Sequence, residues 1–191
     1  MVFSDETSIQ ISASRSLFVR RGRGTHIQPA HVHNPRQSTV KVMFWGCITS
    51  EGPGPLVPIQ GTMTAVKYRE ILERHILPIA NSFGEEEWWY QHDNAPCHSA
   101  AIVREFLEGH HVNVLDWPPY SPDMNIIENV WAVLKRKIYL ETHHTRDSLI
   151  RAAQNIWEND IEIRDLIATL YLGMPRRVNS LRLARGGHTH Y

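Results

Sequence analysis

The stretch KVMFWGCI, residues 41–48, indicates the fold class most clearly. It is rich in β-branched and aromatic residues, and the turn-forming cluster Gly52-Pro53-Gly54-Pro55 follows it, so we expect a buried strand there. Short stretches rich in apolar and aromatic residues predict further strands at residues 1–3, 88–92 and 112–115. Because strands dominate the first third of the chain and helices then alternate with strands, we expect an α/β domain, with a mixed central sheet and helices on both faces.

Apolar residues at helical spacing predict helices over residues 64–77, 99–108, 122–138, 145–158 and 161–172. Thr64 is placed to cap the first of these helices, and Pro78 is expected to end it. Gly109 is expected to cap the second helix at its C-terminus.

Composition favours one globular domain. The chain has 191 residues, of which 42% are hydrophobic and 21% charged, which is enough apolar material for a sizeable core. Cys47 and Cys97 stand far apart without a CxxC spacing, which excludes a disulfide scaffold and a cysteine-rich zinc module. No apolar run reaches the roughly 18 residues of a membrane span, so no membrane partner is expected.

The formal net charge is zero, with 20 Lys and Arg against 20 Asp and Glu, but the charges are unevenly distributed. Residues 7–50 contain six basic and no acidic residues, and the last twenty residues contain four arginines and no acid. Such basic segments could follow a phosphate backbone, although a solvated surface is the plainer interpretation of each one.

Three carboxylates are candidates for chemistry. Asp5 follows an apolar strand start, Asp93 ends the strand at residues 88–92, and Glu128 borders a helical apolar stripe made of Met124, Ile127, Trp131, Leu134 and Ile138. With Ser121 as the cap, Glu128 should lie about two turns into its helix and not on the solvent-facing side of that helix. Three gathered carboxylates would repel one another without a cation, and oxygen ligands suit Mg²⁺ or Mn²⁺. Two such ions would support phosphoryl transfer.

Several motifs share their order and spacing with a known protein family. They are FSDE (residues 3–6), VMFWGC (42–47), QHDNAPCH (91–98), WPPYSPDMNIIENVW (117–131) and MPRRV (174–178). Together they resemble the catalytic domain of mariner-superfamily DNA transposases. Between Asp93 and Glu128 lie 34 residues, which is similar to the branch whose third catalytic residue is Glu. Where the family often has Pro, this chain has Ile126, which is compatible with a helix.

The resemblance implies a ribonuclease-H-like catalytic domain over residues 1–175, with 21–38 as a clamp-like excursion and 176–191 as a basic C-terminal tail. It implies that Asp5, Asp93 and Glu128 bind two Mg²⁺ or Mn²⁺ ions. The enzyme would hydrolyse phosphodiesters at transposon ends, and the freed 3′-hydroxyl would then attack a phosphodiester of target DNA, commonly at TA. It would act as a nuclear homodimer. The expected contacts to double-stranded DNA are Arg20, Arg21, Arg23, Asn94, His98, Trp117, Lys135, Arg176 and Arg177.

Alternatives remain open at this point. Relatives carry helix-turn-helix modules ahead of the catalytic domain and none fits before Asp5, so a truncated or decayed copy that serves as a non-catalytic DNA-binding or interaction module is the main competitor. Histidine pairs at positions 31 and 33, 143 and 144, and 188 and 190 could hold zinc, although no HExxH helix is present. Of the tryptophans, Trp45, Trp88 and Trp131 are expected in the core, and only Trp117 is expected to contact DNA.

Overall fold

The computed structural model describes residues 1–12, 39–84, 87–118, 124–143 and 145–183. Its sheet contains the strands β1 (Val2–Ser12), β2 (Thr39–Thr49), β3 (Gly52–Ile59) and β4 (Tyr90–Gln91). The strand order is β3-β2-β1-β4, with β1 antiparallel to β2, β2 antiparallel to β3, and β1 parallel to β4. The predicted mixed sheet is therefore confirmed, and the stretch 41–48 lies within β2.

The later strands are shorter than predicted. Only two residues of the run 88–92 pair as β4, and the predicted strand 112–115 contributes only an isolated bridge from Val114 to Tyr90. Beyond Gln91 the chain leaves the ladder, and the side chains of His92 and Asp93 make hydrogen bonds to Tyr68 and His98.

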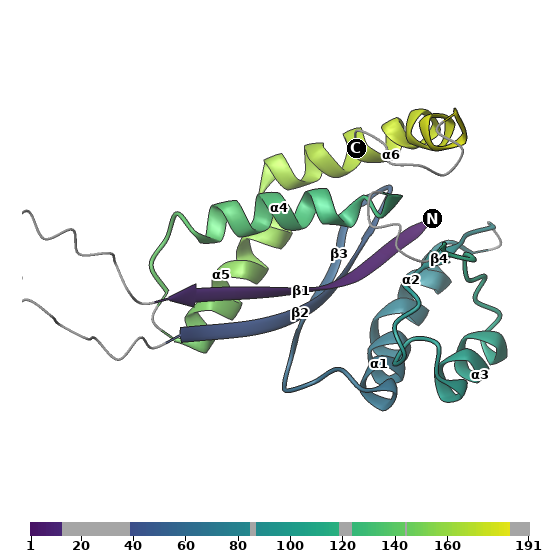
Figure 1. The fold of residues 1–191 in the computed structure, drawn as a ribbon, viewed down its shortest axis with the longest axis horizontal. Helices are drawn as coiled ribbons and strands as arrows, with labels where there is room; N and C mark the ends of the chain where they lie inside the picture. Colours follow the sequence, from purple (N-terminus) through teal and green to yellow (C-terminus); the bar gives the residue numbers. More distant parts are fainter. Residues whose placement is uncertain (13–38, 85–86, 119–123, 144, 184–191) are drawn as a thin grey trace, which may run out of the picture.

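Helices cover both faces of the sheet (Figure 1). One face carries α4 (Ile127–Ile138), α5 (Arg146–Asn159) and α6 (Ile161–Leu183), and a second core lies between the sheet and α1 (Ala65–Ile71), the π-helix η2 (Leu72–Ile76), α2 (Leu77–Ser82) and α3 (Ala101–Gly109). Strand β1 serves both cores, because successive side chains point to opposite faces. Phe3 and Ile9 are buried on the α4 side and Val2 on the α1 side.

Two predicted helix ends are wrong. Pro78 does not end the first helix, because it falls in the first turn of α2, where a backbone N–H needs no helical acceptor, and the π-turn of η2 precedes it. Gly109 is the last residue of α3 and not its left-handed cap, since His111 adopts that conformation instead, with φ of 54°. Thr64 caps α1 as predicted, since its side chain accepts a hydrogen bond from the Lys67 amide.

The last helix is longer than predicted. It runs past Leu172 to Leu183, so residues 176–183, assigned from sequence to a basic tail, are helical. Its second half is held to the domain by contacts to α4, which include the buried Arg177. Residues 184–191 and the predicted excursion at 21–38 lie outside the described residues. None of the helices in the described ranges combines the length and apolar character that a membrane span requires.

Candidate active site

Asp5 lies on β1 and faces α4. The Trp131 indole donates a hydrogen bond from Nε1 to Asp5 Oδ2 at 3.1 Å. The neighbouring strand makes room for this contact, because Asp5 pairs with Gly46, and a Cβ at Gly46 would lie 2.6 Å from Trp131 Cη2. The bare backbone at Gly46 therefore lets the indole approach the sheet and reach Asp5.

Glu128 approaches the same place from the start of α4. It lies in the first turn of that helix and is exposed, so the prediction of a position two turns in and away from the wet side is wrong. The reason is that α4 begins at Ile127. The predicted cap at Ser121 falls outside the described residues.

Asn125 joins the start of α4 to the strand that carries Asp5. Its side-chain amide donates to the Ser4 carbonyl oxygen at 3.1 Å, and its Oδ1 accepts from the Ile127 amide at 3.4 Å. Because Asn125 is buried, these bonds fix the helix start against β1 and hold Glu128 near Asp5.

The Asp5 carboxyl is buried, and the charge of Glu128 acts on it. Burial, followed by the charge of Glu128, raises the pKa of Asp5 to about 7. Both causes disfavour the ionised carboxylate, and the attraction of a cation placed between Asp5 and Glu128 would counteract them. The donor set, one carboxylate on β1 and one at the start of α4, fits a hard divalent cation such as Mg²⁺ or Mn²⁺.

Asp93 is held by a relay on the opposite face of β1. His98 donates from Nδ1 to Asp93 Oδ1 at 2.5 Å and from Nε2 to Glu6 Oε1 at 3.1 Å. The same Asp93 oxygen accepts from the Ala95 amide at 3.0 Å. Asp5 and Glu6 are neighbours on one strand, so their side chains leave it on opposite faces.

The relay carries charge. Burial alone would lower the pKa of His98, but the hydrogen bonds to Asp93 and Glu6 outweigh it and raise the pKa to about 10. The same hydrogen bond from His98 lowers the pKa of Asp93. His92, which stacks beside His98 with ring centroids 5.5 Å apart, responds in the opposite direction, because burial and the charge of His98 lower its pKa to about 4. The raised pKa favours an imidazolium at His98, which can donate a hydrogen bond from each ring nitrogen.

A buried hydroxyl network supports the relay. The Tyr68 hydroxyl lies 2.8 Å from that of Tyr90 and 3.0 Å from His92 Nδ1, and Ser4 Oγ lies 2.7 Å from the Tyr90 hydroxyl. The Tyr68 ring also packs on His98, with centroids 3.9 Å apart. Neighbours on all sides therefore restrain the His98 ring.

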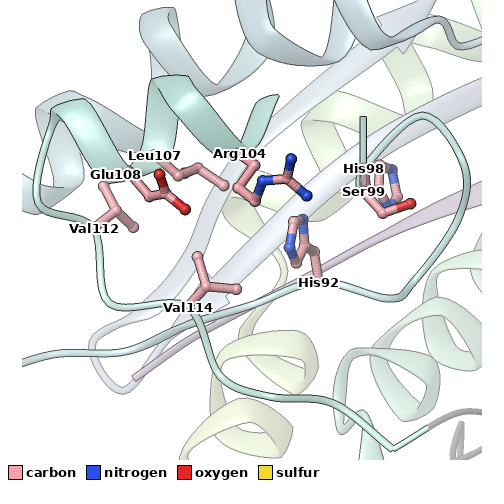
Figure 2. A pocket seen from close by; sticks show the side chains of 8 residues that line it. All are labelled: His92, His98, Ser99, Arg104, Leu107, Glu108, Val112 and Val114. Atoms are coloured by element: carbon pink, nitrogen blue, oxygen red, sulfur yellow. The ribbon is translucent and has the colours of Figure 1, made fainter. Parts of the chain in front are cut away.

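Figure 2 shows a cavity of about 360 Å³ beside this relay. His92, His98 and Ser99 line it on one side, with Arg104, Leu107, Glu108, Val112 and Val114 around the rest. It combines an apolar wall with one guanidinium and one carboxylate, and it borders the residue that binds Asp93.

Within the described residues, no three His, Cys, Asp or Glu side chains are grouped closely enough to hold one metal ion. Asp5 and Glu128 approach each other, whereas the Asp93 carboxylate is engaged by His98 and not gathered with them. The pairing of β1 with β4 nevertheless brings the two aspartates to neighbouring strands, since Phe3 pairs with Gln91 two residues before each of them.

The expected DNA contacts fall into three groups. Trp117 and Arg177 are buried, at 9% and 7% exposure, because Trp117 packs edge-on against Phe3 and Arg177 donates to Asn129 Oδ1 at 3.2 Å. Both side chains are thus packed within the domain, and their contact with DNA stays a prediction. His98 is also buried, within the relay.

Among the remaining expected contacts, Asn94 is exposed and donates to the Trp117 carbonyl oxygen at 2.8 Å, which ties two loops together. Arg176 is exposed and Lys135 partly so, and both stay predicted DNA contacts. The expected contacts Arg20, Arg21 and Arg23 lie outside the described residues.

The histidine pairs gain no support as zinc sites. His143 is buried, and its Nε2 lies 3.2 Å from the Ile138 carbonyl oxygen, where it satisfies the end of α4. The other members, at positions 31, 33, 144, 188 and 190, lie outside the described residues.

Sequence reasoning missed three residues of this site. Glu6 was detectable, because strand alternation places it opposite Asp5 and therefore on the side of His98. Trp131 was correctly predicted in the core, but its indole N–H also reaches Asp5. Asn125 left no signal in the sequence, because its role depends on a contact with Ser4 across 121 residues.

Comparison with known proteins places this geometry in a family. Residues 1–150 match the DDE superfamily endonuclease family. The Tc1 transposase of Caenorhabditis elegans is 33% identical over 196 aligned positions, which cover all of this chain and 70% of that protein. The catalytic domain of Mos1 transposase with raltegravir and Mg superposes with a TM-score of 0.74 at 18% identity, over 99% of this chain and 85% of that one.

The Mos1 transposase paired-end complex with the left transposon end superposes with a TM-score of 0.76 at 19% identity, over 98% of this chain but only 55% of that one. The fold is therefore ribonuclease-H-like, as predicted. On the family match and the identity to Tc1 transposase, the chain belongs to the DDE superfamily of endonucleases, as a catalytic domain of the Tc1/mariner transposase type.

Proposed function

We propose that this domain cuts and joins DNA during cut-and-paste transposition, with Asp5, Asp93 and Glu128 as the ligands of one or two divalent metal ions. The observation that carries the proposal is a buried Asp5 facing the start of α4, where burial and then the charge of Glu128 raise the pKa of Asp5 to about 7. A cation between these two carboxylates would offset their mutual repulsion and so stabilise the folded chain. The Mos1 catalytic domain was solved with Mg, and a Mos1 paired-end complex with Mn, which supports this choice of metal.

When bound, the metal ions would activate a water or a 3′-hydroxyl and stabilise the leaving oxygen of a phosphodiester. The chain itself supplies the orientation. Trp131 holds one oxygen of Asp5, Asn125 fixes the helix start that carries Glu128, and His98 holds one oxygen of Asp93. Each proposed ligand is thus positioned by a neighbouring side chain, either directly or through the helix start that carries it.

The proposed substrate is double-stranded DNA, with transposon ends and a target sequence as its two forms. The Mos1 relatives were solved with transposon ends, as paired-end and strand transfer complexes. In this chain, the exposed Arg176 and the partly exposed Lys135 are available for phosphate contacts. A homodimer and residence in the nucleus follow as further proposals, since two transposon ends are joined and the substrate is chromosomal.

A nicking assay tests the proposal. Supercoiled plasmid is incubated with the 191-residue chain and Mg²⁺ or Mn²⁺, beside Asp93→Asn, Glu128→Gln and the control Glu158→Gln, whose side chain is exposed on α5. We expect metal-dependent nicking by the unmodified chain and the control only. Equal nicking by all four proteins, or none by any, would remove the enzymatic claim and favour a non-catalytic DNA-binding module.

A further inference from the structure

The relay from Glu6 through His98 to Asp93 connects the second carboxylate of the site to the strand that carries the first. Glu6 follows Asp5 directly, and alternation along β1 sends the two side chains to opposite faces of the sheet. Asp93 lies beyond the end of β4, where the ladder with β1 no longer holds it. His98 therefore provides a side-chain link between the Asp93 carboxylate and β1.

We propose that Glu6 and His98 are positioning residues that fix the Asp93 carboxylate relative to Asp5 and thereby set the affinity of the site for divalent cations. The proposal rests on the proposed function, because it takes Asp93 to be a metal ligand. Neither residue is expected to touch the metal or the DNA.

The two carboxylate oxygens of Asp93 differ in their hydrogen bonding. Oδ1 accepts from both His98 Nδ1 and the Ala95 amide, at 2.5 and 3.0 Å. Oδ2 accepts no hydrogen bond from any described residue, and the side chain is 53% exposed. One oxygen is thus held while the other is available to a cation, and carboxylates that bind metals are commonly oriented by hydrogen bonds of this kind.

Glu6 is needed because His98 is buried. The imidazole is 3% exposed, and without Glu6 its Nε2–H would point at no acceptor. The ring cannot turn to find another partner easily, since Tyr68 and His92 pack against its faces. Glu6 therefore determines which way the imidazole presents Nδ1 to Asp93.

The test measures Mn²⁺ binding to the full 191-residue chain by calorimetry and by the loss of the free-ion electron paramagnetic resonance signal. Loss of a residue that orients a metal ligand typically weakens metal binding about 10–100-fold, so Glu6→Ala and His98→Ala should each raise the Mn²⁺ Kd by at least about tenfold. Glu6→Gln keeps an acceptor oxygen for His98 and should recover most of the affinity. Glu105→Ala, an exposed glutamate on α3, is the matched control and should bind as the unmodified chain does.

A second measurement follows the relay without metal. Imidazole ¹⁵N–¹H spectra of the metal-free chain, with His98→Gln to identify the signals, should show both His98 nitrogens protonated. The Nε2–H signal should shift or broaden in Glu6→Ala and return in Glu6→Gln. A merely structural role for Glu6 would lower the melting temperature of Glu6→Ala without this pattern of rescue.

Asp93→Asn separates the possible failures. If Asp93→Asn weakens Mn²⁺ binding while Glu6→Ala and His98→Ala leave it unchanged or tighten it, the relay does not position Asp93 and this inference is overturned alone. If the unmodified chain and Asp93→Asn bind Mn²⁺ equally, Asp93 is no metal ligand, and the proposed function and this inference fail together.

Discussion

Replacement of Asp5 by Asn should stabilise the metal-free domain at alkaline pH. Burial and the charge of Glu128 raise the pKa of Asp5 in the folded chain from 3.8 to about 7. Between these two values the folded state binds a proton that the unfolded state has released, so stability falls as pH rises through this window. Asn has nearly the same shape, still accepts from Trp131, and carries no charge to desolvate.

The magnitude follows from the two pKa values. A pKa difference of one between the folded and unfolded states corresponds to about 1.4 kcal/mol, and the linkage between pH 5 and pH 8 then removes about 2–3 kcal/mol from the free energy of unfolding of the unmodified chain. The advantage of Asp5→Asn should therefore be about 2–3 kcal/mol larger at pH 8 than at pH 5. Such a gain in stability on removal of a functional residue is expected, because active sites often sacrifice stability for activity.

Urea unfolding in the presence of a chelator, followed by tryptophan fluorescence, measures this difference at both pH values. Asp93→Asn is the informative comparison, because the His98 hydrogen bond lowers the pKa of Asp93 and its ionised form stabilises the fold. That stability is present above pH 3.8 and is lost only as pH falls through the lowered value, so Asp93→Asn should destabilise at both pH 5 and pH 8. With the side chain half-exposed, the loss should be about 1 kcal/mol. An Asp5→Asn variant that is less stable than the unmodified chain at pH 8, or a difference that does not change with pH, would refute the reasoning.

Three further predictions concern the support of the site and its DNA contacts. Gly46→Ala places a methyl group against Trp131 and should cost about 1–3 kcal/mol in urea unfolding; an unchanged stability would show that the indole can retreat freely. Asn125→Ala removes the link from the start of α4 to β1 and should cost about 1–2 kcal/mol, with slower plasmid nicking. Two adjacent arginines should differ, because Arg177→Ala should destabilise by about 1–3 kcal/mol. Arg176→Ala should instead leave stability within about 0.5 kcal/mol and reduce the salt dependence of DNA binding by about one ion, as titrations over salt concentration would measure.

Much of the fold was predictable because it depends on local patterns. The run 41–48 is β-branched and aromatic between turn residues, and it lies within β2. Errors arose where tertiary contacts override local preference. Pro78 is tolerated because a π-turn precedes it. Helix α6 continues to Leu183, and within this extension Arg177 bonds to Asn129 on α4.

Candidate residues of the site could be named from the sequence, but their geometry could not be predicted. Asp5 and Asp93 were indicated by their positions at strand ends. The resemblance to transposases added that the surrounding motifs occur in the family's order and spacing. Spacing alone could not show that Asp93 bonds to His98, because that contact depends on the turn between residues 95 and 98. It also could not show that Glu128 lies in the first turn of α4. Trp117 and Arg177 were expected at the DNA because their residue types favour it, and only packing shows that both are buried.

The most direct test of the central claim, that Asp5, Asp93 and Glu128 form one metal site, is a crystal structure of the chain with Mn²⁺. Diffraction data at the manganese absorption edge would locate each ion from its anomalous signal. We predict at least one peak with oxygens of all three carboxylates as ligands, with His98 still bonded to the other oxygen of Asp93. A manganese peak bound by other residues, or ions held by Asp5 and Glu128 while Asp93 stays apart, would contradict the account.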